Sequence, residues 1–182
     1  MDEQRIWAPW RIGYMAGDDD RPTEPAPQPN AWQPGADEGC FLCRAAAQYE
    51  QSDTANKQNL VVAVGQQTCV VLNRYPYTNG HLLVAPLRHV AALDELSPEE
   101  HLETMQTLAG FSELLTGLIR AQGFNVGLNL GGVAGAGLPG HLHWHLVPRW
   151  EGDNNFMPTV AGARCIGQSL EAVWDAITEA IV

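Results

Sequence analysis

The chain has 182 residues, a length that suits one domain with a single hydrophobic core. Its 21 acidic and 10 basic side chains give a formal net charge of −11, and a surface this acidic repels nucleic acid and anionic membranes. The sequence contains no apolar run of roughly eighteen residues that would predict a transmembrane helix, and its start lacks the apolar core of a signal peptide. We therefore expect a cytoplasmic protein without a nucleic-acid or membrane partner.

The N-terminal part of the chain divides into two segments. The first comprises residues 1–16, in which residues 5–15 are aromatic and apolar, and we expect it to dock on the body of the protein. Residues 17–38 contain five of the twelve prolines and three consecutive aspartates, a composition that predicts a mobile or polyproline-like connector. The remaining residues, 39–182, make up the predicted domain.

Short apolar segments in this domain predict strands, and two periodic segments predict helices. A long helix should begin after Ser97, which can cap it, with Pro98 at the first helical position and Glu100 completing a capping box. This helix should end near Gly123. A closing amphipathic helix is predicted over residues 168–182, and the predicted strands span residues 60–64, 68–73, 81–86, 124–130 and 141–149. Because only one long helix interrupts the strands, a mostly antiparallel α+β sheet is favoured over a doubly wound one.

The last predicted strand carries histidines at three alternate positions, His141, His143 and His145. Alternate side chains share one face of a strand, about 6.6 Å apart. Leu142 and Trp144 would then face the core. Three explanations compete: a solvated stripe, a three-histidine metal site, and nucleophilic attack on phosphorus by a neutral imidazole.

The glycine-rich segment that precedes these histidines favours the third explanation. Half of residues 131–140 are glycine. Such a loop can turn backbone N–H groups toward phosphate oxygens without obstruction by side chains. These neutral donors could hold an anion despite the net negative charge of the chain.

Several motifs resemble the histidine-triad (HIT) superfamily. They are His141 to Val147 (His-x-His-x-His and two apolar residues), Asn79 to Pro86 with Arg88-His89, and Gly39 to Cys43. Segments such as Ile6 to Arg11 and Gly152 to Pro158 are similar to one bacterial branch, the diadenosine tetraphosphate phosphorylase-like proteins. The resemblance covers nearly the whole chain outside the connector. It implies a HIT-like fold, and a homodimer is common in this superfamily.

The resemblance also implies catalytic roles for the three histidines. His143 would be the nucleophile and form a nucleotidyl-histidine intermediate, which phosphate or water would then release. His145 would contact the phosphate and the leaving group. His141 would orient the nucleophile or serve a metal.

Three further positions match nucleotide-binding residues of the superfamily. Asn73 would contact ribose hydroxyls, Asn129 would lie near the phosphate, and His81 would be an auxiliary histidine beside the triad. The sequence departs from many members because residues 131–140 contain no Ser or Thr to bond the phosphate. The phosphates would then depend on the backbone N–H groups of Gly135, Ala136 and Gly137, which favours the phosphorylase-like branch.

Cys40 and Cys43 form a Cys-x-x-Cys pair, which is typical of redox or zinc sites. No thioredoxin-like strand and helix follow, so zinc or two plain buried thiols are favoured. Resemblance to galactose-1-phosphate uridylyltransferases and to several bacterial triad proteins implies zinc bound by Cys40, Cys43, His89 and His141. Four protein ligands close a tetrahedral site, so this zinc would be structural.

The function expected is cleavage of a dinucleoside polyphosphate, or a related nucleoside phosphate, through His143. Two alternatives stay open at this point. One is a zinc hydrolase in which all three triad histidines bind a catalytic metal. The other is a non-catalytic nucleotide-binding module built on the same fold.

Overall fold

In the computed structural model, residues 29–49, 53–153 and 166–181 are described. The predicted docking segment, residues 1–16, and the connector up to residue 28 lie outside them. Residues 29–40 contain no helix or strand, although Trp32 and Ala36 pack against the hydrophobic core. No helix among the described residues is both long enough and apolar enough to span a membrane.

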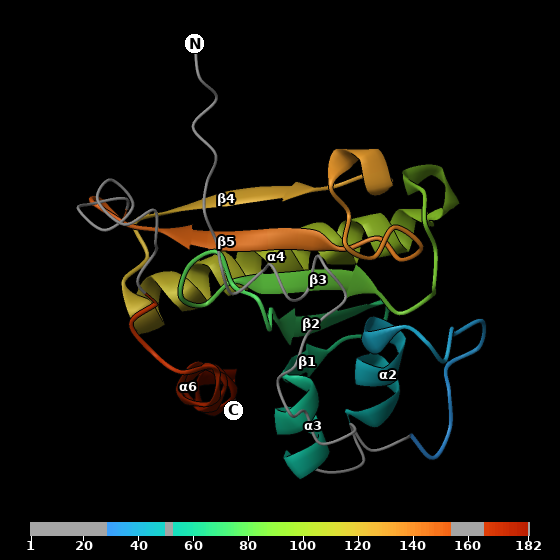
Figure 1. The fold of residues 1–182 in the computed structure, drawn as a ribbon, viewed down its shortest axis with the longest axis horizontal. Helices are drawn as coiled ribbons and strands as arrows, with labels where there is room; N and C mark the ends of the chain where they lie inside the picture. Colours follow the sequence, from blue (N-terminus) through green and yellow to red (C-terminus); the bar gives the residue numbers. More distant parts are fainter. Residues whose placement is uncertain (1–28, 50–52, 154–165, 182) are drawn as a thin grey trace.

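One five-stranded sheet organises the described part of the chain, in the order β1-β2-β3-β5-β4 (Figure 1). Every neighbouring pair is antiparallel. With the helices around it, this sheet confirms the α+β prediction. All five strands lie at or close to their predicted positions: β1 (Val61–Val64), β2 (Thr68–Leu72), β3 (Leu82–Pro86), β4 (Gly123–Leu128) and β5 (Trp144–Arg149).

The long helix α4 (Pro98–Ile119) lies behind the sheet in Figure 1 and contacts β2, β3 and β5. It begins as predicted, because the Ser97 side chain accepts from the Glu100 N–H and the Glu100 carboxylate accepts from the Ser97 N–H. It ends at Ile119, four residues before Gly123, because Arg120 adopts a left-handed conformation with φ of 54°. The closing helix α6 (Leu170–Ile181) contacts α4 and β1.

Two short helices, α2 (Phe41–Gln48) and α3 (Asp53–Asn59), precede the sheet and were not anticipated from the sequence. They pack on β1 and, for α2, also on β2. The buried side of α2 is made by small and apolar side chains, among them Leu42 and Ala45. Cys40 and Cys43 lie at the start of this helix, which gives both thiols a fixed position.

The strand predicted over residues 141–149 begins only at Trp144, so its first three residues were assigned wrongly. The backbone N–H of Leu142 donates to the oxygen of Val90, 2.7 Å away, and not to a neighbouring strand. This connection turns the chain before β5 toward the segment that follows β3. Leu142 and Trp144 are buried in the core, as the alternation predicted.

Candidate active site and metal centre

His143 stands immediately before β5 and is almost completely buried, with 8 % of its surface exposed. Its Nδ1 lies 2.8 Å from the backbone oxygen of His141. A carbonyl oxygen can only accept, so Nδ1 carries the proton and Nε2 keeps its lone pair. Burial lowers the pKa of His143, because a charged imidazolium is poorly solvated there. The ring is therefore a neutral imidazole with a defined nucleophilic nitrogen.

His145 lies beside His143, with the two ring centroids 5.2 Å apart and the planes at 67°. Nδ1 of His145 is 3.0 Å from Nε2 of the fully buried His81. The register explains this contact, because His145 pairs with Leu83 across the β3–β5 ladder and His81 immediately precedes β3. The predicted auxiliary histidine thus touches the third triad histidine.

Tyr77, which the sequence analysis did not single out, supports His81 in two ways. Its backbone N–H donates to Nδ1 of His81 over 3.1 Å. Its ring stacks on the imidazole at a centroid distance of 4.8 Å and an interplanar angle of 20°. A backbone donor has no signature in the sequence, so only the folded loop between β2 and β3 reveals this contact.

The two cysteines and two histidines predicted to bind zinc lie together, and their candidate ligand atoms are all within 4.8 Å of one another. Nδ1 of His141 is 3.3 Å from Sγ of Cys40 and 3.5 Å from Sγ of Cys43. Nδ1 of His89 is 3.3 Å from Sγ of Cys43. Among the described residues this is the one cluster of Cys, His, Asp and Glu side chains with metal-binding geometry.

The outer nitrogen of each clustered histidine faces an acceptor. Nε2 of His141 donates to the backbone oxygen of Pro86 over 2.9 Å, which leaves the lone pair of Nδ1 directed at the thiols. Nε2 of His89 is 3.9 Å from a carboxylate oxygen of Asp37. The hydrogen bond of His141 is the kind of outer contact that metal-binding histidines make as a rule, whereas the Asp37 carboxylate lies near His89 beyond hydrogen-bond distance. Two thiols and two oriented imidazole nitrogens therefore fit a tetrahedral zinc ion.

The two thiols of the cluster differ in acidity. A hydrogen bond from Cys43 and the contact with His141 lower the pKa of Cys40 against the opposing effect of burial, to about 3. The same hydrogen bond and burial raise the pKa of Cys43. Cys69 in β2 is fully buried, which raises its pKa to about 12, so it packs as a small hydrophobic side chain outside the cluster.

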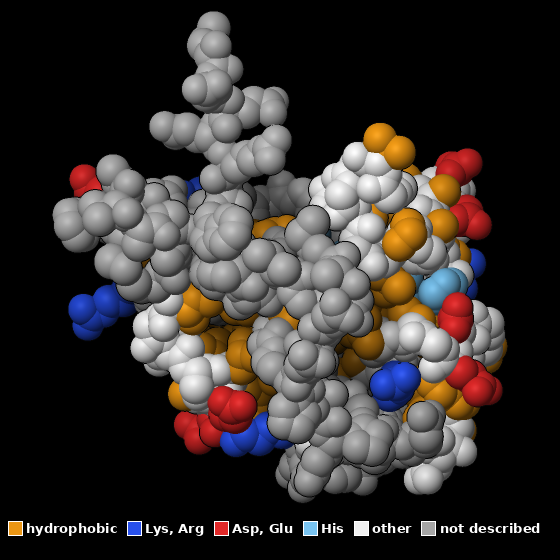
Figure 2. All heavy atoms as spheres, in the orientation of Figure 1, with side chains coloured by type: hydrophobic (Ala, Val, Ile, Leu, Met, Phe, Trp, Pro, Cys, Tyr) orange, Lys and Arg blue, Asp and Glu red, His pale blue; other side chains and the backbone are white. Residues whose placement is uncertain are grey.

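The glycine-rich loop is exposed and contains the short 3-10 helix η2 (Gly132–Ala134). Two of its three predicted phosphate-binding amides donate inside the loop, Gly135 N–H to Gly132 and Ala136 N–H to Gly131. The side chain of Asn129 reaches the oxygen of Gly135 at 3.5 Å. Figure 2 shows apolar side chains on the surface in this region, where Val133 is fully exposed.

The three triad rings do not face a common position where one metal ion could be bound. The ring of His141 faces the two thiols, Nδ1 of His143 faces a backbone oxygen, and Nδ1 of His145 faces His81. A catalytic metal held by all three histidines would need different orientations of these rings. The arrangement therefore favours a separate cysteine–histidine centre beside a nucleophilic imidazole.

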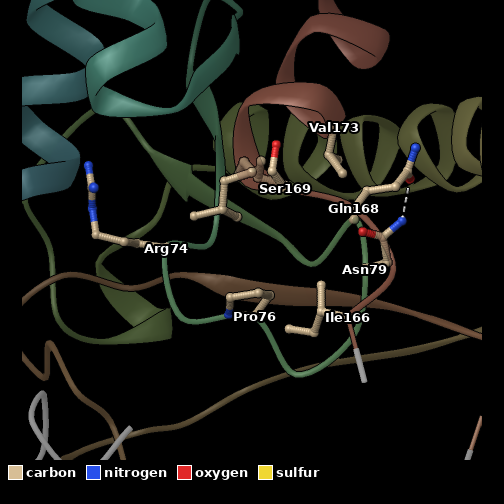
Figure 3. A pocket seen from close by; sticks show the side chains of 10 residues that line it. Arg74, Pro76, Asn79, Ile166, Gln168, Ser169 and Val173 are labelled. Carbon is tan, nitrogen blue, oxygen red and sulfur yellow. Dashed lines mark hydrogen bonds between the residues drawn. The ribbon is translucent and has the colours of Figure 1, made fainter. Parts of the chain in front are cut away.

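A pocket of about 270 Å³ lies elsewhere, between the β2–β3 loop and the start of α6 (Figure 3). Arg74, Pro76 and Asn79 line it from the loop, and Gln168 and Val173 line it from the α6 side. None of its described lining residues is a predicted site residue.

Known proteins are similar to this chain in sequence. The HIT domain family matches residues 54–152. The AP-4-A phosphorylase of Mycobacterium tuberculosis (strain H37Rv) is 38 % identical over 167 residues, which cover 92 % of this chain and 78 % of that protein. The bis(5'-nucleosyl)-tetraphosphatase [asymmetrical] of Schizosaccharomyces pombe is 32 % identical over 82 residues, 45 % of this chain and 44 % of that protein.

Solved structures share the fold. A hypothetical histidine triad nucleotide-binding protein from Sulfolobus tokodaii is 27 % identical with a TM-score of 0.55, covering 67 % of this chain and 83 % of that one. A Zn-bound histidine triad family protein from Mycobacterium smegmatis has the same TM-score and the same coverage at 23 % identity. On the family match and the 38 % identity over most of its length, this chain belongs to the HIT domain family.

Proposed function

We propose that this protein cleaves a dinucleoside polyphosphate through a nucleotidyl-histidine intermediate on His143, and that diadenosine tetraphosphate is its substrate. The observation that carries the proposal is the fixed tautomer of His143, whose Nδ1 donates to the His141 oxygen and whose Nε2 keeps its lone pair. The name of the AP-4-A phosphorylase relative supports the choice of substrate.

The first step transfers a nucleotidyl group to the protein. Nε2 of His143 attacks the α-phosphorus, the P–N bond forms, and the P–O bond to the leaving nucleoside triphosphate breaks. His145, whose ring lies 5.2 Å from that of His143, donates to the departing oxygen. In the second step an oxygen of phosphate or water attacks the same phosphorus, and the P–N bond breaks. Phosphate gives ADP and water gives AMP, with ATP released in the first step in both cases.

The nucleotide itself would be held by the positions predicted from the sequence. Asn73 and His81 lie next to the triad, and Asn129 lies next to the glycine-rich loop. Phosphate binding by Gly135 and Ala136 requires these N–H groups to give up their bonds to Gly132 and Gly131. The loop would therefore change conformation when substrate binds.

We also propose that Cys40, Cys43, His89 and His141 bind zinc, with a structural role. The donor set, its spacing and the outer partners of both histidines support this proposal. When bound, the metal supplies charge neutralisation for the thiolates and a cross-link between α2, the segment after β3 and the residue that orients His143. No ligand position is left for substrate, so the chemistry belongs to the histidines.

We also propose that the protein is a homodimer and that it is cytoplasmic. A homodimer is supported by β4, which lies at one edge of the sheet and exposes Val126, and by α4, which exposes Leu102 and Met105. A cytoplasmic location stays a prediction of the sequence, and it is consistent with the free thiols of Cys40, Cys43 and Cys69.

The test is to incubate the protein with diadenosine tetraphosphate, with and without phosphate, and to identify the products. Phosphate-dependent ADP plus ATP means phosphorolysis, and AMP plus ATP means hydrolysis. His143→Ala should abolish turnover and the covalent AMP adduct while the circular dichroism spectrum is unchanged. Full activity of this variant would eliminate the mechanism.

A further inference from the structure

We infer that His145 serves the reaction as a neutral hydrogen-bond donor that keeps its proton, so that the site selects substrates with a weakly basic leaving group, such as phosphoanhydrides, over alkyl esters and phosphoramidates. The inference rests on the proposed function for the reaction itself. It deepens that proposal, because it names the chemical property that decides which nucleoside phosphates are cleaved. A chain of hydrogen bonds from the backbone of Tyr77 to His145 carries it.

One backbone donor sets the tautomer of His81. The N–H of Tyr77 donates to Nδ1 of His81 over 3.1 Å, and a backbone N–H cannot accept. Nδ1 therefore keeps its lone pair, and the proton of the neutral ring is on Nε2. A second proton, on Nδ1, would place two N–H groups against each other at a ring that is 0 % exposed. His81 is therefore held as a neutral ring.

The tautomer of His81 in turn determines the state of His145. Nε2 of His81 lies 3.0 Å from Nδ1 of His145. Because the first of these atoms carries the proton, the second accepts, and the proton of the neutral His145 ring is on its Nε2. A cationic His145 would need a proton on Nδ1 as well, directed at the N–H of His81. His145 can thus offer an N–H to a departing oxygen, but the loss of this proton would leave an imidazolate anion.

The Tyr77 N–H is fixed in place, because the loop between β2 and β3 is anchored next to this residue. Oγ1 of Thr78 donates to the oxygen of Pro148 in β5 over 2.8 Å. The Asn79 side chain donates to that of Gln168, which lies just before α6 (Figure 3). The direction of the hydrogen-bond chain is therefore a property of the fold and is present before any substrate binds.

No proton moves when a nucleotidyl group is transferred in such a site. The lone pair of Nε2 of His143 forms the P–N bond, and the Nδ1 proton of this ring stays on its bond to the His141 oxygen. The electron pair of the breaking P–O bond stays on the departing oxygen, which leaves as an anion stabilised by the His145 N–H. The end of a polyphosphate is a weak base and can leave in this way. An amine is far more basic and needs a proton in order to leave.

A series of aryl esters of AMP tests the inference, because their phenols differ in basicity and little in size. The kcat/KM value reports the step in which the phenol leaves. For the wild type it should fall roughly five- to tenfold for every tenfold rise in the basicity of the phenolate. A fall of less than about twofold would mean that a proton is delivered to the leaving group. That result would overturn the inference and leave the proposed function standing.

His81→Glu and His81→Gln form a matched pair of variants, because the two new side chains have the same size and reach. The carboxylate only accepts, so it draws a proton onto Nδ1 of His145 and turns this ring into a cation that can give its Nε2 proton away. The amide can still donate to Nδ1 and keeps His145 neutral. We expect the dependence on the phenol to become shallow, less than about twofold per tenfold in basicity, only in His81→Glu. Equal dependences in the two variants would contradict the inference.

The state of His145 can also be measured without any nucleotide. The long-range ¹H–¹⁵N NMR spectrum of the imidazoles near neutral pH, with His145 assigned by His145→Gln, should show an unprotonated Nδ1 and a protonated Nε2 for this ring. Protons on both nitrogens, or on Nδ1 alone, would overturn the inference even if every ester is cleaved. Absence of turnover and of an AMP adduct with all esters would instead refute the proposed function, and the spectrum would still decide the state of His145.

Discussion

His141 acts on His143 through its backbone oxygen, 2.8 Å from Nδ1 of that ring, while its own ring lies 3.3 Å from the sulfur of Cys40. One residue thus belongs to both the proposed metal centre and the proposed active site. A shift of the His141 backbone that accompanies loss of the thiol contacts would also move the carbonyl that sets the tautomer of His143. The metal centre and the activity should therefore be coupled although no metal ligand touches the substrate.

Loss of the metal centre should lower stability and activity together. We expect about one zinc per chain, and Cys40→Ser should abolish stoichiometric zinc and lower Tm by at least about 5 °C, or about 2 kcal/mol at this chain length. Elemental analysis and calorimetry measure the two effects. Cys69→Ala, which removes a buried thiol outside the cluster, should keep its zinc. Purified wild type that is free of zinc and gains no stability when zinc is added would contradict this prediction.

Gly140→Ala should weaken zinc binding, although Gly140 is not itself a proposed ligand. A Cβ at this position would lie 3.2 Å from Nε2 of His89, so the ring must shift by a few tenths of an ångström from its present position. We expect zinc affinity to fall roughly ten- to hundredfold, as is typical when the support of a ligand is disturbed. Competition with a chromogenic chelator measures the affinity. Gly132→Ala in the same loop meets no atom within 4 Å and should bind zinc like the wild type.

The buried carboxylate of Glu100 should make stability depend on pH in the acid range. Its hydrogen bonds to Arg88 lower its pKa below the ordinary value of 4.5. A carboxyl whose pKa is lower in the folded state stabilises the fold above the pKa of the unfolded chain, and this contribution is lost as pH falls through the folded pKa. Glu100→Gln should thus lower the free energy of unfolding by about 1–2 kcal/mol at pH 7, and the deficit should shrink below pH 4.5. Urea titrations at several pH values test this, with the exposed Glu99→Gln as control. A deficit that stays constant down to pH 3 would rule out the ion pair as its source.

The exposed edge of the sheet should mediate association of two chains. β4 pairs with β5 on one side, and among the described residues no strand pairs with its other side. Val126 on this strand is 52 % exposed. Val126→Glu should shift a dimer toward monomer in light scattering at micromolar concentration, whereas Val133→Glu, in the exposed η2 helix, should not. A monomeric wild type, or a Val126→Glu protein that remains dimeric, would disprove the role of this edge.

The sequence predicted the sheet and α4 well because their signals are local. Alternating or continuous apolar runs marked the strands, and Ser97 with Glu100 marked the start of α4. The short helices α2 and α3 were missed, since their packing on β1 and β2 depends on contacts distant in sequence. The start of β5 was wrong because the Leu142 N–H bonds to Val90, a partner that no periodicity reveals.

The sequence predicted those residues of the candidate site whose side chains belong to a recognisable motif. Cys40, Cys43, His89 and His141 lie together as the resemblance implied. The residues that orient these ligands were not predictable, because they act through backbone atoms or from a distant segment. Tyr77 uses its N–H and Pro86 its carbonyl oxygen, and Asp37 reaches His89 from a segment without helix or strand.

β5 lies between β3 and β4 in the sheet. Residues Trp144 to Leu146 pair with β3 on one side and β4 on the other, so their amide hydrogens should exchange with deuterium only when the sheet opens as a whole. The glycine-rich loop next to them is exposed and should exchange quickly. His143, the proposed nucleophile, therefore stands at the boundary between a slowly exchanging strand and a quickly exchanging loop of the described residues.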